Sequence, residues 1–109
     1  MQAFNVSDLE ADRARRRILY HEFLRVPSLS CGVYGVPAGG SDPQTPHAED
    51  EVYYVVRGQG RIRVGSEDRE VLGGSIVFVP AAEDHRFHDV VEDLAILVFF
   101  APAERTVAP

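Results

Sequence analysis

The feature that most constrains the fold is a succession of short β-prone runs separated by turns rich in Gly and Pro. The runs are Cys31–Val36, Glu51–Val56, Arg61–Val64, Arg69–Leu72, Ser75–Val79, His85–Asp89 and Leu94–Phe100. The breaks between them include Pro37–Gly40, Gly58–Gly60, Gly65–Asp68, Gly73-Gly74 and Pro80–Ala82. Many short strands at such regular intervals indicate an all-β sandwich or barrel.

The N-terminal segment differs from the rest, because its pattern predicts a short helix over residues 8–17. Ser7 is expected to cap this helix, and Glu10 follows at the spacing of a capping box. Asp12 and Arg16 are spaced to form an i,i+4 ion pair on the helix surface. The segment is therefore read as a solvated helix rather than as a basic binding surface.

The length of 109 residues is typical of a single domain. Residues 18–26 mix apolar and polar side chains and are expected to enter a strand, which Pro27 interrupts. The predicted organisation is an N-terminal helix and arm at 1–26, a β-barrel domain at 27–103 and a C-terminal tail at 104–109.

Composition excludes several classes of function. The formal net charge is −6, whereas nucleic-acid binding normally requires a basic surface. No apolar run approaches the ~20 residues that cross a bilayer, and the first residues lack the apolar core of a signal peptide. The single cysteine, Cys31, cannot form an intramolecular disulfide. We expect a cytoplasmic protein that binds neither nucleic acid nor membrane.

Strand alternation predicts which side chains face the barrel interior. Glu51 shares a strand face with Tyr53 and Val55, because residues two apart point the same way. His85 shares a face with Phe87 in the same manner, and Phe87 belongs inside. Two ionisable groups, a carboxylate and an imidazole, are thus assigned to an otherwise apolar interior.

A metal ion explains both groups at once. A buried carboxylate without a partner costs several kcal/mol, and a divalent ion satisfies carboxylate and imidazole ligands together. His47 lies four residues before Glu51 and can reach the same mouth of the barrel. The alternatives are a Glu51–His85 hydrogen bond without metal, or solvent-exposed side chains at strand ends. Tyr53 is the candidate catalytic residue, because it shares a face with Glu51 and could support a metal ligand or act as an acid or base. The alternative is that its ring fills the barrel as a core aromatic.

The remaining polar residues are given structural roles. His88 points away from His85 on its strand and is assigned to the surface or an interface. His21 has no partner by spacing and is expected to be exposed or structural. Glu49 shares strand parity with His47 and Glu51 and is able to reach the site, but it is read as a solvated loop residue. Cys31 is expected to be a buried, inert thiol.

Two segments of the chain resemble the two motifs of the cupin superfamily. The first motif, Gly, five residues, His-x-His, three or four residues, Glu, six residues, Gly, is matched by Gly39, His47, Glu51 and Gly58. The second, Gly, five residues, Pro-x-Gly, two residues, His, three residues, Asn, is matched by Gly74, Pro80 and His85, with Ala82 in place of the Gly and Asp89 in place of the Asn. The resemblance covers about residues 30–101, and the two motifs in this order make it specific.

The resemblance implies a double-stranded β-helix, which is a jelly-roll barrel of two antiparallel sheets, here with a short N-terminal helix. It also implies a homodimer and a bound divalent ion, for which we expect iron, zinc, manganese or nickel. The usual ligand set of the family is two His and a Glu from the first motif and one His from the second.

One departure from the family pattern bears on the site, because Thr45 stands where the first histidine is expected. The set that remains is His47, Glu51 and His85, and such a 2-His-1-carboxylate arrangement leaves coordination positions open. The amide oxygen of Gln44 is a candidate for a fourth contact. Alternatively, metal affinity is weakened and the site holds no ion.

The sequence indicates the function only at the level of its general class. One hypothesis is a metal-dependent enzyme on a small organic molecule: a dioxygenase with iron, or an isomerase or lyase with a metal that acts as a Lewis acid. The alternative is a non-catalytic module that binds or senses a small molecule. A third hypothesis is a barrel without metal. The fold does not decide between them, because the superfamily supports many unrelated activities.

The vacancy at Thr45 generates a prediction. Thr45→His should tighten binding of a divalent metal, because it restores an imidazole at the position where the family has one. Thr45→Ala should leave the affinity unchanged, because a threonine hydroxyl is a poor ligand for these ions. Titration of both variants with Zn²⁺ in competition with a chromogenic chelator measures the effect. An unchanged affinity in Thr45→His would show that residue 45 does not occupy the missing ligand position.

Overall fold

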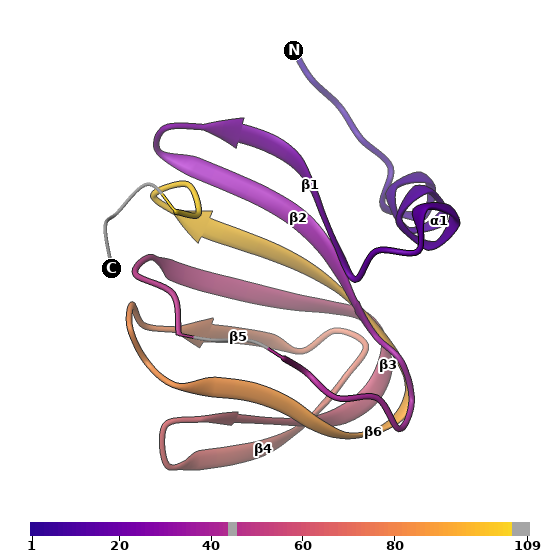
Figure 1. Ribbon diagram of the computed structural model, residues 1–109, viewed down its shortest axis with the longest axis vertical. Coiled ribbons are helices and arrows are strands. Elements are labelled where there is room, and N and C mark those ends of the chain that lie inside the picture. Colours follow the sequence, from indigo (N-terminus) through magenta and orange to yellow (C-terminus); the bar gives the residue numbers. More distant parts are fainter. Residues whose placement is uncertain (44–45, 106–109) are drawn as a thin grey trace.

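The computed structural model describes residues 1–43 and 46–105 (Figure 1). Within these ranges the chain forms one helix and six strands. They are α1 (Val6–Arg16), β1 (Tyr20–Val26), β2 (Leu29–Val36), β3 (Asp50–Val64), β4 (Glu67–Leu72), β5 (Ile76–Val79) and β6 (His85–Ala101). No helix in the described part of the chain has the length and apolar character needed to cross a membrane.

All strand pairings are antiparallel, in the order β1-β2-β6-β3-β4, with β5 paired to β3. The long strands β3 and β6 pair along most of their lengths and contribute to both sides of the molecule. The first part of β3 pairs with β5 and with the end of β6, whereas its second part pairs with β4 and with the start of β6. The sheet therefore curls over itself (Figure 1), which confirms the predicted all-β barrel.

Two of the predicted breaks between strands are bends within a single longer strand. The runs Glu51–Val56 and Arg61–Val64 are joined in β3, and the runs His85–Asp89 and Leu94–Phe100 are joined in β6. Register shifts between the two strands fall around Gly58–Gly60, where extra residues bulge out of the ladder. A bulge bends and twists a strand without ending it. These irregularities let β3, which carries the glycines, and β6 turn together from one side of the barrel to the other.

The predicted cap of the helix is wrong. α1 begins at Val6 with Asn5 as N-cap, so that Ser7 lies inside the first turn. Asn5 has extended backbone angles, and no side-chain hydrogen bond caps the helix. Glu10 does not turn back toward the helix start, because its carboxylate accepts hydrogen bonds from Arg13 at 2.9 and 3.0 Å. An i,i+3 ion pair within α1 thus takes the place of the expected capping box.

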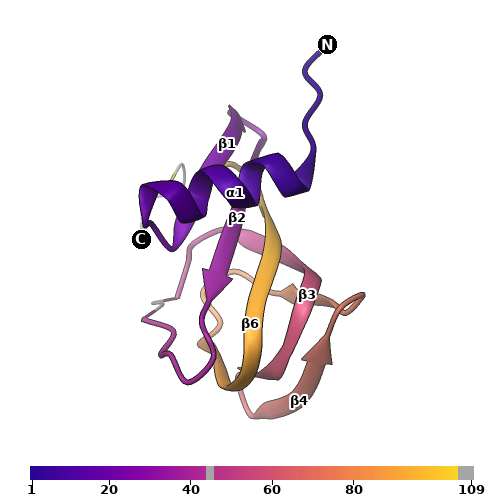
Figure 2. The same ribbon diagram turned by 90° about the vertical axis from the view of Figure 1, so that its right-hand side faces the viewer.

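α1 lies across the outer face of β2 and contacts both β1 and β2 (Figure 2). Arg13 bridges this contact, since it donates a hydrogen bond to the carbonyl of Ile18 at 2.9 Å while its guanidinium lies over Gly35. A side chain at Gly35 would collide with that guanidinium. The expected ion pair between Asp12 and Arg16 is present at 3.3 Å.

The barrel interior contains the residues that alternation predicted. Glu51, Tyr53 and Val55 are buried on one face of β3, and His85 and Phe87 are buried on β6. Apolar side chains from β2, β3, β4, β5 and β6 fill the rest of the core. The predicted strand over 18–26 is confirmed by β1, which pairs with β2. The division of the chain at residues 26 and 103 stays a prediction.

The bend in β3 generates a prediction at Gly58. This glycine has φ +101°, and an added Cβ would lie 2.2 Å from the carbonyl oxygen of Asp93. Gly58→Ala should therefore lower the free energy of unfolding by about 2–5 kcal/mol, from left-handed strain of ~1–2 kcal/mol and overpacking of ~1–3 kcal/mol. Urea denaturation measures the change.

Gly74→Ala is the matched control, because Gly74 has φ +99° and no atom within 4 Å of an added Cβ. It carries the strain without the collision, so we expect a loss of only ~1–2 kcal/mol. Equal losses in the two variants would contradict the close backbone approach at the bend.

Candidate metal centre

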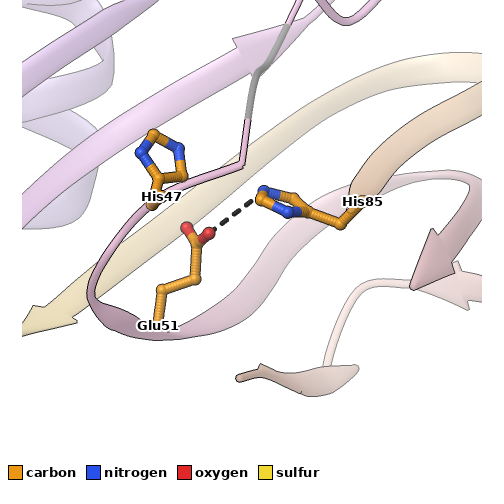
Figure 3. A group of neighbouring side chains, drawn as sticks. All are labelled: His47, Glu51 and His85. Carbon is orange, nitrogen blue, oxygen red and sulfur yellow. Dashed lines mark ion pairs between the residues drawn. The ribbon is translucent and has the colours of Figure 1, made fainter. Parts of the chain in front are cut away.

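Three side chains from different segments converge inside the barrel. His47 lies in the connection between β2 and β3, Glu51 near the start of β3, and His85 at the start of β6. One candidate ligand atom from each lies within 4.8 Å of the other two. Glu51 and His85 are only 2% and 4% exposed, and His47 is partly buried. In Figure 3 the Glu51 carboxylate reaches up between the two imidazole rings.

The connection that carries His47 is tied to the barrel by Asp42. This buried carboxylate accepts a hydrogen bond from the Tyr34 hydroxyl at 2.5 Å and another from the backbone N–H of Phe87 at 2.8 Å. The backbone N–H of Ala82 also donates to the carbonyl of His47 at 2.6 Å. The loop is thereby attached to β2, to β6 and to the turn before β6, which places the His47 ring over the interior.

The protonation of His85 is constrained by its backbone contact. Its Nδ1 lies 2.9 Å from the carbonyl oxygen of Glu83, and because a carbonyl only accepts, Nδ1 carries the proton. In the neutral ring Nε2 is then an acceptor, and it lies 3.0 Å from Oε1 of Glu51. Two lone pairs at this distance repel each other. The contact therefore requires either a proton on Nε2 or a cation shared by the two groups.

The first of these possibilities is reflected in the titration of His85. Burial on its own lowers the pKa of the imidazole, because it disfavours the charged form. The carboxylate of Glu51 and the carbonyl of Glu83 act in the opposite direction and outweigh burial. The net effect raises the pKa of His85 above its ordinary value, so positive charge is favoured at this point of the interior.

The donor set fits a divalent metal ion. Among residues 1–43 and 46–105, no group gives a well-directed hydrogen bond to either buried oxygen of Glu51. Bonds of about 2.0–2.2 Å from a metal to nitrogen and oxygen place adjacent donor atoms about 3 Å apart, close to the Glu51–His85 separation of 3.0 Å. Two imidazoles and one carboxylate are common ligands for iron, zinc, manganese and nickel.

A carboxylate outside the barrel strands lies next to His47. Oε2 of Glu104 is 3.4 Å from Nδ1 of His47. Burial raises the pKa of Glu104, and the nearby His47 imidazole partly offsets this effect. The His47 ring also packs edge-on against Phe100, with centroids 5.0 Å apart. The imidazole thus contacts both Glu104 and Phe100.

A cavity of about 340 Å³ opens beside His47 and Glu51. Its wall combines aromatic and aliphatic side chains with a few polar groups, namely Leu19, Tyr20, Tyr34, Pro43, His47, Glu51, Tyr53, Val98, Phe100, Glu104 and Arg105. Mostly apolar walls with a few convergent polar groups are typical of small-molecule sites. Tyr53 is 1% exposed, and its ring lies 6.0 Å from that of His85 and 4.9 Å from that of Phe87. It therefore contributes to both the core and the cavity wall.

The other residues considered from the sequence are placed as follows. His88 points outward and contacts Asp68 at 2.8 Å, as expected for a surface residue. His21 is partly buried and lies 3.8 Å from Asp12 of the helix. Cys31 is buried, as predicted. Glu49 is buried as well, so its interpretation as a solvated residue is wrong. Gln44 and Thr45 lie outside the described residues, and the candidate contact of Gln44 stays a prediction.

Two residues of the site were missed by sequence reasoning. Asp42 follows Gly39-Gly40 in a turn-rich stretch, where an acidic residue gives no sign of burial. Glu104 lies in the segment predicted as a C-terminal tail, 53 positions after Glu51 along the chain. Contacts between such distant segments depend on the closed barrel, so no local pattern indicates them.

Comparisons with known proteins agree with this architecture. A family model described as "Cupin domain" matches residues 32–100. An uncharacterized protein of Streptomyces coelicolor is 49% identical over 104 residues, which cover 95% of this chain and 99% of that protein.

Solved structures share the fold at low sequence identity. TT1209 from Thermus thermophilus matches with a TM-score of 0.76 and 20% identity, over 94% of this chain and 99% of that one. BH2720 from Bacillus halodurans matches with a TM-score of 0.77 and 17% identity, over 93% and 80%. A cupin 2 conserved barrel domain protein from Rhodopseudomonas palustris matches with a TM-score of 0.69 and 24% identity, over 78% of this chain and 61% of that one. These likenesses confirm the predicted jelly-roll barrel.

The Asp42 contacts generate a prediction. Tyr34→Phe removes one donor to a buried carboxylate and should lower the free energy of unfolding by about 1–3 kcal/mol. Tyr54→Phe is the control, because Tyr54 is exposed on the outer face of β3 and should change stability by less than ~0.5 kcal/mol. Chemical denaturation of both variants gives the comparison. Equal stabilities would show that the Tyr34–Asp42 contact does not hold the loop.

Proposed function

This chain belongs to the cupin family, since the family model covers residues 32–100, and we propose that it binds one divalent metal ion through His47, Glu51 and His85. The observation that carries the proposal is the state of Glu51. Its two oxygens are buried, lie beside two imidazoles and receive no well-directed hydrogen bond in the described part of the chain. A cation shared by the three side chains would offset the free-energy cost of burying this carboxylate.

The proposed activity is a metal-dependent reaction of a small organic molecule, of the dioxygenase, isomerase or lyase type. The bound ion would supply Lewis-acid chemistry or, as iron, redox chemistry. Three protein ligands leave coordination positions free, as catalytic sites generally do. The adjoining cavity of about 340 Å³ is large enough for a small organic ligand.

The cavity wall supports this choice of ligand. Tyr20, Tyr34, Tyr53 and Phe100 offer aromatic surface, so a partly apolar molecule is favoured. The buried hydroxyl of Tyr20 receives and gives no hydrogen bond within residues 1–43 and 46–105. A polar group on the ligand would satisfy it. Tyr53 is the proposed acid–base residue, because it lines the cavity next to Glu51.

Three further expectations stay predictions. The first is the alternative function, in which the protein binds or senses a small molecule in the same cavity without converting it. The homodimer is supported by exposed apolar side chains at Leu72, Ile76 and Phe78, which a second copy could cover. The cytoplasmic location rests on sequence composition alone.

Metal content tests the proposal. After purification without chelators, or after reconstitution with Fe²⁺, Zn²⁺, Mn²⁺ or Ni²⁺, elemental analysis should give about one ion per chain. Glu51→Gln and His85→Ala should each weaken binding by more than ~100-fold, because a direct ligand matters more than the outer partners, whose loss costs ~10–100-fold. Competition with a chromogenic chelator measures the affinities.

His88→Ala is the matched control, since His88 lies on the same strand but contacts Asp68 on the outside. It should retain wild-type affinity. The proposal fails if reconstituted protein holds no ion, or if His88→Ala loses more metal than His85→Ala.

A further inference from the structure

We propose that Glu104 is a positioning residue for His47, which accepts the proton of Nδ1 and thereby presents Nε2 to Glu51 and His85. This inference rests on the proposed metal function and deepens it, because it names a residue outside the ligand set on which metal affinity depends. Neither cupin-like motif of the sequence contains Glu104, which lies beyond the last strand.

The contact itself is direct, and both side chains are largely buried. Oε2 of Glu104 lies 3.4 Å from Nδ1 of His47, and the two side chains are only 14% and 20% exposed. An ionised carboxylate has acceptors only, so a hydrogen bond in this contact requires the proton to lie on the imidazole nitrogen. With Nδ1 protonated, Nε2 is the nitrogen with a lone pair in the neutral ring.

The backbone around Glu104 is anchored, so that the side chain has little freedom to leave His47. The N–H of Glu104 donates to Oγ of Ser30 at 2.9 Å, and its carbonyl accepts from Arg25 at 2.6 Å. The preceding N–H, of Ala103, donates to the carbonyl of Pro27 at 3.2 Å, and Ala103 is fully buried. Three hydrogen bonds to β1, to β2 and to the turn between them thus fix the segment at the mouth of the cavity.

The two candidate imidazole ligands are then oriented in the same way. Nδ1 of His85 donates to the carbonyl of Glu83 at 2.9 Å, and Nδ1 of His47 faces Glu104 at 3.4 Å. Such outer partners fix the tautomer and ring orientation of metal-binding histidines and raise their basicity. Figure 3 shows the two rings on either side of the Glu51 carboxylate, as this arrangement requires. Orientation matters more in a reduced ligand set, because each remaining histidine contributes a larger share of the affinity.

The first measurement needs no metal. ¹⁵N NMR of the His47 ring, at a pH well above the ordinary imidazole pKa of ~6.5, reports which nitrogen carries the proton. The wild-type protein should show the Nδ1–H tautomer. Glu104→Ala should relax the ring toward the mixture found in a free imidazole. Glu104→Gln should retain part of the preference, because its amide oxygen still accepts a hydrogen bond.

The second measurement is the affinity for Zn²⁺, by competition with a chromogenic chelator. Glu104→Ala should weaken Zn²⁺ binding by about 10–100-fold, and Glu104→Gln by less. Glu22→Gln is the matched control, because Glu22 lies near enough to influence Glu104 electrostatically but pairs with Arg25. It removes the same charge from the same region and should leave both the tautomer and the affinity unchanged. Thermal unfolding confirms that each variant is folded.

The outcomes separate the two proposals. Retention of the Nδ1–H tautomer in folded Glu104→Ala would overturn the role of Glu104, and so would equal losses of Zn²⁺ affinity in Glu22→Gln and Glu104→Ala. A tautomer that shifts in Glu104→Ala, in a protein that binds no metal even as wild type, would establish the positioning contact and refute the metal function instead.

Discussion

The buried carboxylate of Glu51, held 3.0 Å from the His85 imidazole, is the constraint on which the site depends. The proton on Nδ1 of His85 faces the Glu83 carbonyl, so the ring turns an acceptor nitrogen toward the carboxylate. Positive charge must therefore reside between the two groups, as a proton or as a metal ion. A proton would satisfy Glu51 and His85 alone, whereas the proposed divalent ion would also bind the second imidazole, from His47.

The barrel brings the three side chains together by bending two long strands. β3 and β6 turn from one side of the molecule to the other, and they stay paired on both sides of the bulges around Gly58–Gly60. The connection that carries His47 is then attached by Asp42, and the segment after β6 is attached to the β1–β2 hairpin. Elements outside the central strands thus close over the cavity and position one of its three candidate ligands.

The sequence predicted the barrel and the interior position of Glu51 and His85, because strand alternation is a local property that survives folding. It failed wherever long-range packing decided the outcome. The glycines near Gly58 were interpreted as a break, since a bulge and a turn have the same composition. Glu49 was interpreted as solvated, and the contact of Glu104 was not anticipated. The Glu104–His47 contact joins segments that approach each other only in the closed barrel.

The most direct test of the metal site is a crystal structure of metal-loaded protein with anomalous diffraction at the absorption edge of the metal. A bound ion should give one strong anomalous peak within bonding distance of Nε2 of His47, a carboxylate oxygen of Glu51 and Nε2 of His85. A map with no peak among these atoms, or with the metal at another site, would contradict the proposed metal site.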